Sequence, residues 1–308
     1  MGSGAAVQLA VSLSHIDGFS GPHQAGLLPL AVAADAAGVD QIVLSEHVVL
    51  AKEIYGHPGA RPGDAVTRFP FPSDEEYPDP LVALAAIAAV TTRARLSTNV
   101  LLAALRPPVL LAKMAATVDV LSGGRLDLGI GVGWHLDEFA ALGVPFDGVG
   151  ARLEDTVRAC QVLWRGGPSS FASPTVGFDD VYCSPTPVQP GGIPVWFGGS
   201  ARPAVARRVA ELGHGWSPIG NTSPDDVAAG CALIREECAR IGRDAGEIAV
   251  RCSLPAGPDL ATTVAGAKEF AAAGATIVQL PALPRLVDTV DDVGPMLSDA
   301  KEMLYATA

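Results

Sequence analysis

Hydrophobic positions along the chain follow two alternating patterns. Short apolar runs recur between longer stretches in which apolar residues return every three or four positions. The short runs predict strands and the longer stretches predict helices. The predicted strands are 7–12, 41–45, 95–101, 126–132, 194–197, 215–218, 248–253 and 276–280. The predicted helices are 27–37, 80–91, 108–121, 150–163, 202–212, 224–241, 262–273 and 290–305.

Eight strands alternating with eight helices predict an α/β fold, the (β/α)₈ or TIM barrel, over one domain spanning 1–308. The length of 308 residues is somewhat above the roughly 250 typical of that fold. The strands lack a strict alternation of apolar and polar residues, as expected when both faces of a sheet are covered. A doubly wound sheet is the alternative. It would leave two open edges, and no short charged edge strand stands out.

Two insertions interrupt this rhythm. Residues 51–77 follow the second predicted strand and are rich in Pro, Gly, Asp and Glu. They leave the carboxyl end of a strand, the side on which barrel active sites lie, so we predict a lid. Residues 165–192 follow the fourth predicted helix and carry five prolines. They would enter at the opposite face of the barrel, where we expect a structural or interface role.

Composition excludes several classes of partner. The net charge is −12 and there is no Lys/Arg-rich run, so we expect neither a nucleic acid nor an anionic membrane as partner. The N-terminal segment has no basic region typical of a signal peptide, and the most apolar stretch, 81–90, is too short to cross a bilayer. Five scattered cysteines without a C-x-x-C pair disfavour a disulfide framework or a zinc site. We therefore expect a cytoplasmic protein without a metal site.

The fourth predicted strand is unusually poor in side chains. It lies in the run LSGGRLDLGIGVGW, which begins at Leu121, and it lacks side chains at Gly129, Gly131 and Gly133. Glycine in a strand costs entropy and contributes no contacts, so such a strand needs a compensating reason. A flat ligand against bare backbone is one reason, and tight packing against a neighbouring element is the other. The run is not a dinucleotide-binding fingerprint, because the third glycine is missing.

Titratable residues follow the second and third predicted strands. Glu46 and His47 come where the second strand gives way to the predicted lid. A histidine there can exchange a proton with a reacting centre, or it can form a buried His–Glu contact that only fixes the loop. Arg106 lies near the end of the third strand, where either an anionic ligand or an acidic lid residue could be its partner.

A candidate anion site follows the fifth predicted strand. Gly198, Gly199 and Ser200 precede a helix, whose free N–H groups and positive dipole end favour an anion. Arg202 could add charge-assisted bonds. The alternative is an ordinary Ser N-cap with glycines in the turn. No H-E-x-x-H, G-x-S-x-G or Walker sequence occurs, and the histidines are mostly in predicted loops, so a metal hydrolase is disfavoured.

These motifs, in this order and spacing, resemble the luciferase-like flavin and deazaflavin oxidoreductase superfamily. The resemblance is closest to its actinobacterial branch that uses coenzyme F420. It extends over roughly residues 40 to 220. The matching segments are 45–50, 91–102, 111–134, 138–146, 163–164, 194–199 and 213–216.

The resemblance implies a cofactor ring at the carboxyl mouth of the barrel. In deazaflavin relatives an acidic residue, commonly Asp, and a histidine end the second strand, here Glu46 and His47. Relatives carry a cis peptide bond at the end of the third strand, which falls here between Asn99 and Val100. The other residues implied to hold the cofactor are Gly131, Val132, Gly133 and Trp134 along the ring and its side chain, and Gly198, Gly199 and Ser200 at the phosphate.

The expected activity is hydride transfer between coenzyme F420 and a small organic substrate. His47 would exchange a proton with the substrate, and Glu46 would orient His47. The alternative is an FMN-dependent monooxygenase supplied by a separate reductase, and a third possibility is a non-catalytic flavin-binding barrel, against which the pair of polar residues counts. Relatives are often homodimers. The apolar helices near 81–90 and 109–121 are candidates for such an interface, although the core of a barrel explains them equally well.

Overall fold

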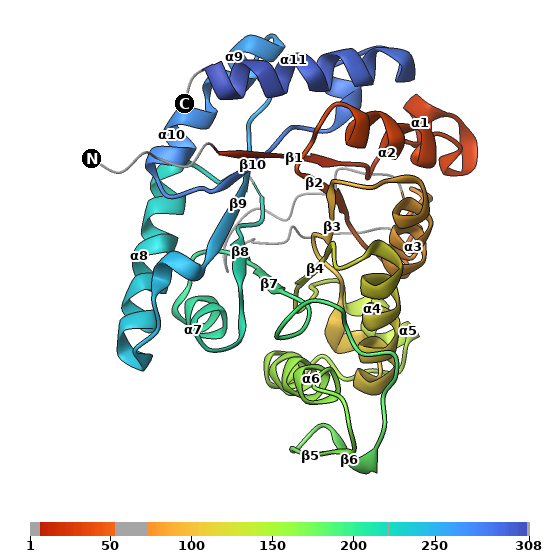
Figure 1. Ribbon diagram of the computed structural model, residues 1–308, viewed down its shortest axis with the longest axis vertical. Helices are drawn as coiled ribbons and strands as arrows, with labels where there is room; N and C mark the ends of the chain where they lie inside the picture. Colours follow the sequence, from red (N-terminus) through yellow and green to blue (C-terminus); the bar gives the residue numbers. More distant parts are fainter. Residues whose placement is uncertain (1–6, 53–72, 221, 307–308) are drawn as a thin grey trace.

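The computed structural model describes residues 7–52, 73–220 and 222–306. Within these residues, eight parallel strands close into a barrel in the order β1-β10-β9-β8-β7-β4-β3-β2 (Figure 1). The predicted (β/α)₈ barrel is thus confirmed, and the open doubly wound sheet is wrong, because β1 pairs with both β2 and β10. The strands are β1 (Gln8–Ser12), β2 (Gln41–Leu44), β3 (Arg95–Thr98), β4 (Leu126–Ile130), β7 (Val195–Gly198), β8 (Gly215–Ser217), β9 (Ala249–Ser253) and β10 (Ile277–Gln279).

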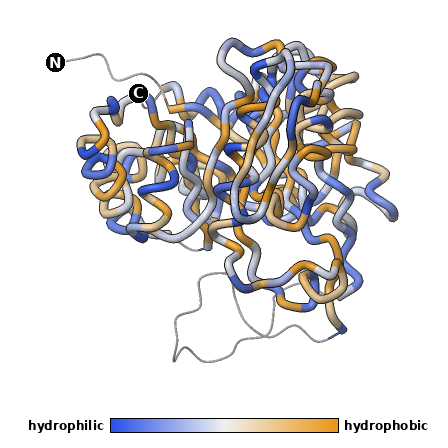
Figure 2. The backbone as a smooth tube through the Cα atoms, turned by 90° about the horizontal axis from the view of Figure 1, so that it is seen from below, coloured by the Kyte–Doolittle hydropathy of each residue, from blue (hydrophilic) through white to orange (hydrophobic). Residues whose placement is uncertain are grey.

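Helices surround the strands (Figure 1), and hydrophobic and hydrophilic residues are mixed along the backbone (Figure 2). The predicted helix over 262–273 is divided at Gly266 into two short ones. The pattern did not predict the short helices α1 (Asp17–Ser20) and α5 (Leu136–Ala141). The remaining helices are α2 (Leu27–Ala36), α3 (Pro80–Val90), α4 (Pro108–Ser122), α6 (Val149–Leu163), α7 (Pro203–Leu212), α8 (Pro224–Ile241), α9 (Leu260–Ala265), α10 (Ala267–Ala272) and α11 (Val293–Ala306).

The main hydrophobic core lies between the strands and the helices that cover them. Leu9, Ile42, Leu96 and Val278 on the strands are fully buried there. Burial of this apolar surface is the main term that stabilises the barrel. All five cysteines are buried and free, so the prediction that they form no disulfide framework is confirmed. Among the described residues, no helix is both long enough and apolar enough to span a membrane.

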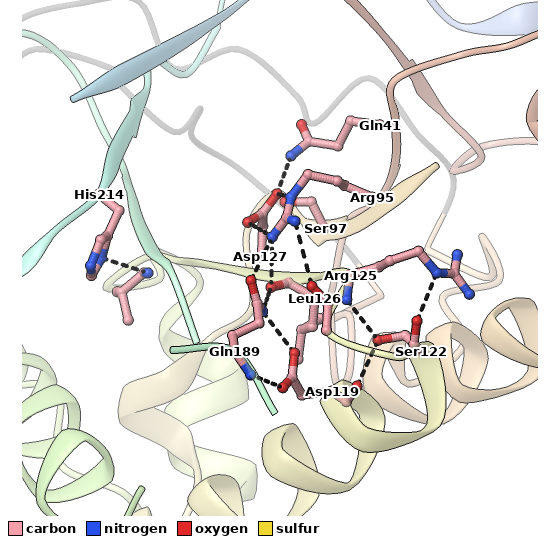
Figure 3. Close-up of polar contacts among 12 residues, drawn as sticks. Gln41, Arg95, Ser97, Asp119, Ser122, Arg125, Leu126, Asp127, Gln189 and His214 are labelled. Atoms are coloured by element: carbon pink, nitrogen blue, oxygen red, sulfur yellow. Dashed lines mark hydrogen bonds and ion pairs between the residues drawn. The ribbon is translucent and has the colours of Figure 1, made fainter. Parts of the chain in front are cut away.

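The insertion at 165–192 contains a hairpin that the sequence pattern did not predict. Strands β5 (Ser169–Ala172) and β6 (Gly177–Val181) pair antiparallel beside α6, away from the barrel (Figure 1). The chain then returns, and Gln189 Nε2 donates to Asp119 Oδ1 and to the Leu126 carbonyl, both at 2.7 Å. Gln189 Oε1 accepts from Arg95 at 3.0 Å (Figure 3). The insertion therefore seals the amino end of β3 and β4, in agreement with the predicted structural role. Of the predicted lid, 53–72 lie outside the described residues.

Asp35 at the end of α2 fixes the connection between α3 and β3. Its carboxylate accepts from the N–H groups of Thr92, Arg93 and Ala94 at 3.0, 2.9 and 2.7 Å. Burial by itself would raise the pKa of Asp35, but these backbone hydrogen bonds outweigh it and hold the pKa below the ordinary aspartate value. The carboxylate therefore stabilises the fold in its ionised form.

Replacing Asp35 by Ala is expected to lower the free energy of unfolding by about 2 kcal/mol near neutral pH, since three backbone donors lose a charged acceptor. A depressed folded-state pKa gives stability that is complete above the unfolded value, about 3.9, and is lost as pH falls through the folded value. Urea unfolding at neutral pH and below about pH 4 measures this. An equal difference between wild type and variant at both pH values would contradict the charge-dependent part.

Candidate active site

A cavity of about 1090 Å³ opens at the carboxyl ends of the barrel strands. Every strand of the barrel contributes a lining residue, either from its carboxyl end or from the loop that follows. One residue from each strand, in chain order, is Ser12, Glu46, Asn99, Gly131, Gly198, Pro218, Ser253 and Gln279. The site residues predicted from the sequence all line this one cavity: Glu46, His47, Asn99, Val100, Gly131, Val132, Gly133, Trp134, Gly198, Gly199 and Ser200.

Val100 forms a shelf in the cavity wall. The peptide bond between Asn99 and Val100 is cis, as the family resemblance implied. A Cβ on Gly131 would lie 2.6 Å from Val100 Cγ2, and one on Gly198 would lie 2.4 Å from Val100 Cγ1. These two glycines therefore provide the space that the Val100 side chain occupies between β4 and β7.

Gly129 has a different reason to lack a side chain. A Cβ there would lie 1.9 Å from the Thr98 carbonyl oxygen, so β3 and β4 approach too closely for any other residue. Close packing, one of the two readings of the glycine-rich strand, accounts for Gly129. Gly133 instead has a φ of +80°, a backbone conformation that favours glycine. Only the tertiary structure separates these roles, because the sequence shows the same residue at each position.

His47 is held by a carboxylate that the sequence analysis did not assign. His47 Nδ1 lies 3.1 Å from Glu138 Oε2, and the side chain of Glu138 is completely buried. Glu138 Oε1 accepts from the Val48 N–H at 2.7 Å, which fixes the carboxylate in place. Glu138 is therefore the residue that orients His47, and the predicted orienting role of Glu46 is wrong. The sequence did offer one indication of Glu138, because it is the first residue of the family-matching segment 138–146.

Glu46 forms an ion pair with Arg106. Its Oε2 accepts from the Leu102 N–H at 2.6 Å and from Arg106 Nη1 at 3.0 Å. Arg106 also reaches Asp79 at 2.7 Å. Burial raises the pKa of Glu46, and the Arg106 guanidinium opposes that rise. Arg106 therefore contacts Glu46 and Asp79, neither of which belongs to the predicted lid.

Aromatic rings surround the His47 imidazole. Tyr77 and Trp134 meet it edge to face at centroid distances of 5.0 and 5.8 Å. His135 lies 6.4 Å away, and its Nε2 accepts from the Ala51 N–H at 3.1 Å. Tyr77 ends the insertion at 51–77, so this insertion contributes one ring to the wall around His47. The side chain of His47 is only 10% exposed.

Three lining residues carry a buried polar atom without a hydrogen-bond partner: Ser45 Oγ, Asn99 Oδ1 and Gln279 Oε1. An unpaired buried polar atom costs roughly 1–3 kcal/mol, so native proteins rarely leave one without a use. A bound ring that carries both N–H and carbonyl groups has donors and acceptors for atoms of this kind. These three unpartnered atoms, two acceptors and one hydroxyl, thus fit a flavin or deazaflavin, whose ring edge is an amide-like pyrimidine.

The candidate anion site lies at the start of α7. Gly199 and Ser200 line the cavity, and the Trp216 indole N–H donates to the Gly199 carbonyl at 2.9 Å. The N-cap residue of α7 is Arg202, without a side-chain cap bond, so the reading of Ser200 as an ordinary N-cap is wrong. Arg202 also lines the cavity, which adds positive charge beside the helix N-terminus. Arg208 lines it from the second turn of α7, and its Nε donates to Glu154 Oε1 at 2.8 Å.

The described residues bring together no group of three or more His, Cys, Asp or Glu that could hold a metal ion. What they do bring together is a closed barrel with a largely buried histidine, a hydrophobic shelf and a candidate anion site at its carboxyl mouth. This arrangement defines the class of (β/α)₈ barrels that bind a small molecule at the ends of their strands. The chain belongs to the luciferase-like monooxygenase family, whose model matches residues 10–273.

Comparison with known proteins extends this result. An uncharacterized protein of Mycobacterium tuberculosis strain H37Rv is 33% identical over 225 residues, covering 71% of this chain and 76% of that protein. An F420-dependent secondary alcohol dehydrogenase, solved with an F420–acetone adduct, has a TM-score of 0.76 at 14% identity over 97% of this chain and 99% of its own. The oxygenating constituent of the Pseudomonas putida 3,6-diketocamphane monooxygenase, solved with FMN, has a TM-score of 0.63 at 17% identity over 82% and 68%.

Proposed function

We propose that the protein is an F420-dependent oxidoreductase that transfers a hydride between the deazaflavin and a small organic substrate. The observation that carries the proposal is that one cavity gathers the Val100 shelf, the unpartnered polar atoms and the His47–Glu138 pair. The fold of an F420-dependent alcohol dehydrogenase supports the same reading. The cofactor would supply the hydride chemistry, and the protein would supply orientation and electrostatics.

Each residue has a task that follows from its surroundings. Val100 would support one face of the ring, and Asn99 Oδ1 would accept from a ring N–H group. Ser200 would bind the phosphate with its backbone N–H at the start of α7, whereas the Gly199 N–H already donates to the Ser217 carbonyl at 3.1 Å. His47 would give a proton to the substrate oxygen, or take one from it, while Glu138 keeps the imidazole in one orientation. The aromatic rings around His47 would exclude water from this exchange.

A second candidate is an FMN-dependent monooxygenase served by a separate reductase. The fold shared with the FMN-bound oxygenating constituent favours it. The shelf and the phosphate seat suit either ring, because flavin and deazaflavin share the pyrimidine edge and the phosphate-bearing side chain. A non-catalytic flavin-binding barrel is disfavoured, since it has no need of a buried carboxylate that fixes a cavity histidine.

Titration of the purified apoprotein with coenzyme F420 and with FMN tests the proposal. We expect F420 to bind at least about tenfold more tightly, a difference of about 1.4 kcal/mol. Quenching of cofactor fluorescence measures both dissociation constants. The His47→Ala variant is the matched control and should bind the cofactor like the wild type. Tighter binding of FMN would instead support the monooxygenase, and no binding of either would overturn both.

We further propose that a second copy of the chain covers α3 and α4. The core accounts for the inward residues of these helices, but Val82, Leu110 and Leu121 are 65, 53 and 59% exposed. Large apolar side chains exposed on two helices that pack together make these helices candidates for an interaction surface. The wild type is expected to be a dimer by sedimentation velocity, and Val82→Glu is expected to be monomeric with an unchanged far-UV spectrum. A monomeric wild type would contradict this.

A further inference from the structure

Arg251 is a buried cation inside the barrel. It lies on β9, is 1% exposed, and does not line the cavity. Its Nη1 donates to Gln41 Oε1 at 2.7 Å and to Ser97 Oγ at 3.0 Å, and its Nη2 donates to the Thr98 carbonyl at 3.4 Å. Its Nε has no hydrogen-bond partner. A guanidinium with every contact neutral is an uncommon and costly feature of a protein interior.

The neighbouring carboxylate does not form an ion pair with Arg251. Asp127 accepts from Arg95 Nε and Nη2 at 2.7 and 2.6 Å, and from Gln41 Nε2 at 2.8 Å (Figure 3). Gln41 thus stands between Asp127 and Arg251. Burial lowers the pKa of Arg251 to about 10, so the group remains charged at neutral pH. The nearby thiol of Cys252 is neutral, because burial raises its pKa to about 12. Arg251 therefore has no ion pair of its own: Asp127 attracts it only at longer range, and its guanidinium lies 5.4 Å from the centre of the Trp196 ring.

The Arg251 guanidinium lies inside the barrel, just below the residues that line the cavity. Residues two apart on a strand share a face, and Ser253, two residues beyond Arg251, lines the cavity. Arg251 also bonds to the carbonyl of Thr98, the residue immediately before Asn99. A Cβ on Gly129 would lie 3.7 Å from Arg251 Nη2, so the backbone of β4 packs beside the guanidinium just below the cavity. A hydrocarbon side chain would fill the volume without the cost of burying a charge.

We propose that Arg251 is a positioning residue whose positive charge, which has no direct ion pair, stabilises negative charge on a redox ring bound above it. This inference rests on the proposed function and holds for either cofactor. When a substrate is oxidised, its hydride adds to the ring and makes the ring more negative by one charge, while the second hydrogen leaves as a proton to His47. Reduction of a substrate runs the same steps backward. A fixed cation below the cavity favours the reduced, more negative ring over the oxidised one.

The affinities of the oxidised and reduced cofactor measure this effect directly. Arg251→Met removes the charge and keeps an unbranched aliphatic stem, and it is expected to weaken binding of the reduced form relative to the oxidised form on the order of tenfold. Arg251→Lys keeps the charge and should retain the wild-type ratio. Arg125→Met is the matched control: it removes another arginine that donates to backbone carbonyls, at the turn before β4, and it should leave the ratio unchanged.

A measurement on the wild type covers the case in which Arg251→Met does not fold. The reduced ring is expected to lose its proton at a lower pH when bound than when free, which its absorbance reports. Arg95, Asp127 and Cys252 are the charged and titratable groups around Arg251. An unchanged or higher ionisation pH, or an unchanged affinity ratio in a folded Arg251→Met, overturns the inference while the proposed function stands. A wild type that binds neither cofactor overturns both.

Discussion

Replacing His47 by alanine is expected to lower turnover by about 10²- to 10⁴-fold, the usual contribution of a general acid or base. The imidazole lies in the cavity wall and is held at Nδ1 by the buried Glu138. Its loss removes the group that would exchange a proton with the substrate. The dissociation constant of the cofactor should change little, because the shelf and the phosphate seat lie on other strands.

Steady-state kinetics with the cofactor that binds, together with its dissociation constant, measure this split. Glu138→Gln is expected to lower turnover as well, since the amide keeps the shape but loses the charge that orients His47. His23→Ala is the matched control, because His23 is exposed and does not line the cavity. Unchanged turnover in His47→Ala would rule out the proposed role.

Replacing Gly129 by alanine is expected to have the largest effect on stability in this chain. The new Cβ would lie 1.9 Å from the Thr98 carbonyl oxygen, which is backbone of the neighbouring strand and cannot turn away. Overpacking of this kind costs roughly 3 kcal/mol or more, a large part of the total stability of a domain. Loss of soluble, folded protein, or a strongly lowered Tm, is the expected readout. Gly294→Ala is the control, because its nearest neighbour, Ala33 Cβ, is 3.8 Å away.

Gly131 and Gly198 offer a sharper test of the same packing. Alanine at either position meets a methyl group of Val100, at 2.6 or 2.4 Å, and is expected to cost roughly 1–3 kcal/mol. Adding Val100→Ala removes those methyl groups, so the double variants should recover much of the loss. Gly129→Ala should not be rescued in this way, because its clash is with Thr98. Additive effects in the double variants would contradict the seating of Val100 between the two glycines.

The order of strands and helices could be predicted from the sequence because each element carries its own period of apolar residues. The exceptions have local causes. The β5–β6 hairpin is short, largely exposed and interrupted by Pro174, so its apolar residues form no strong pattern. The helix over 262–273 divides at Gly266, where no change of apolar period marks a boundary.

The candidate site was partly predictable, because residues at the carboxyl ends of parallel barrel strands must meet at one mouth. This reasoning brought together Glu46, His47 and the turn at Gly198. It could not pair them, since Glu46 and His47 are adjacent in sequence but bond to Arg106 and Glu138, 60 and 91 positions away. Neighbouring residues that leave a strand point in different directions, so adjacency in sequence gives no contact.

The sequence alone determined the barrel, the family and the end of the barrel where chemistry would occur, because periodicity and motif spacing are local properties of the chain. The tertiary structure decided which carboxylate orients His47, why each glycine of β4 and β7 lacks a side chain, and that Arg251 is left without a paired charge. These features depend on contacts between strands that are distant in sequence. Their distances and burial exist only once the barrel has closed.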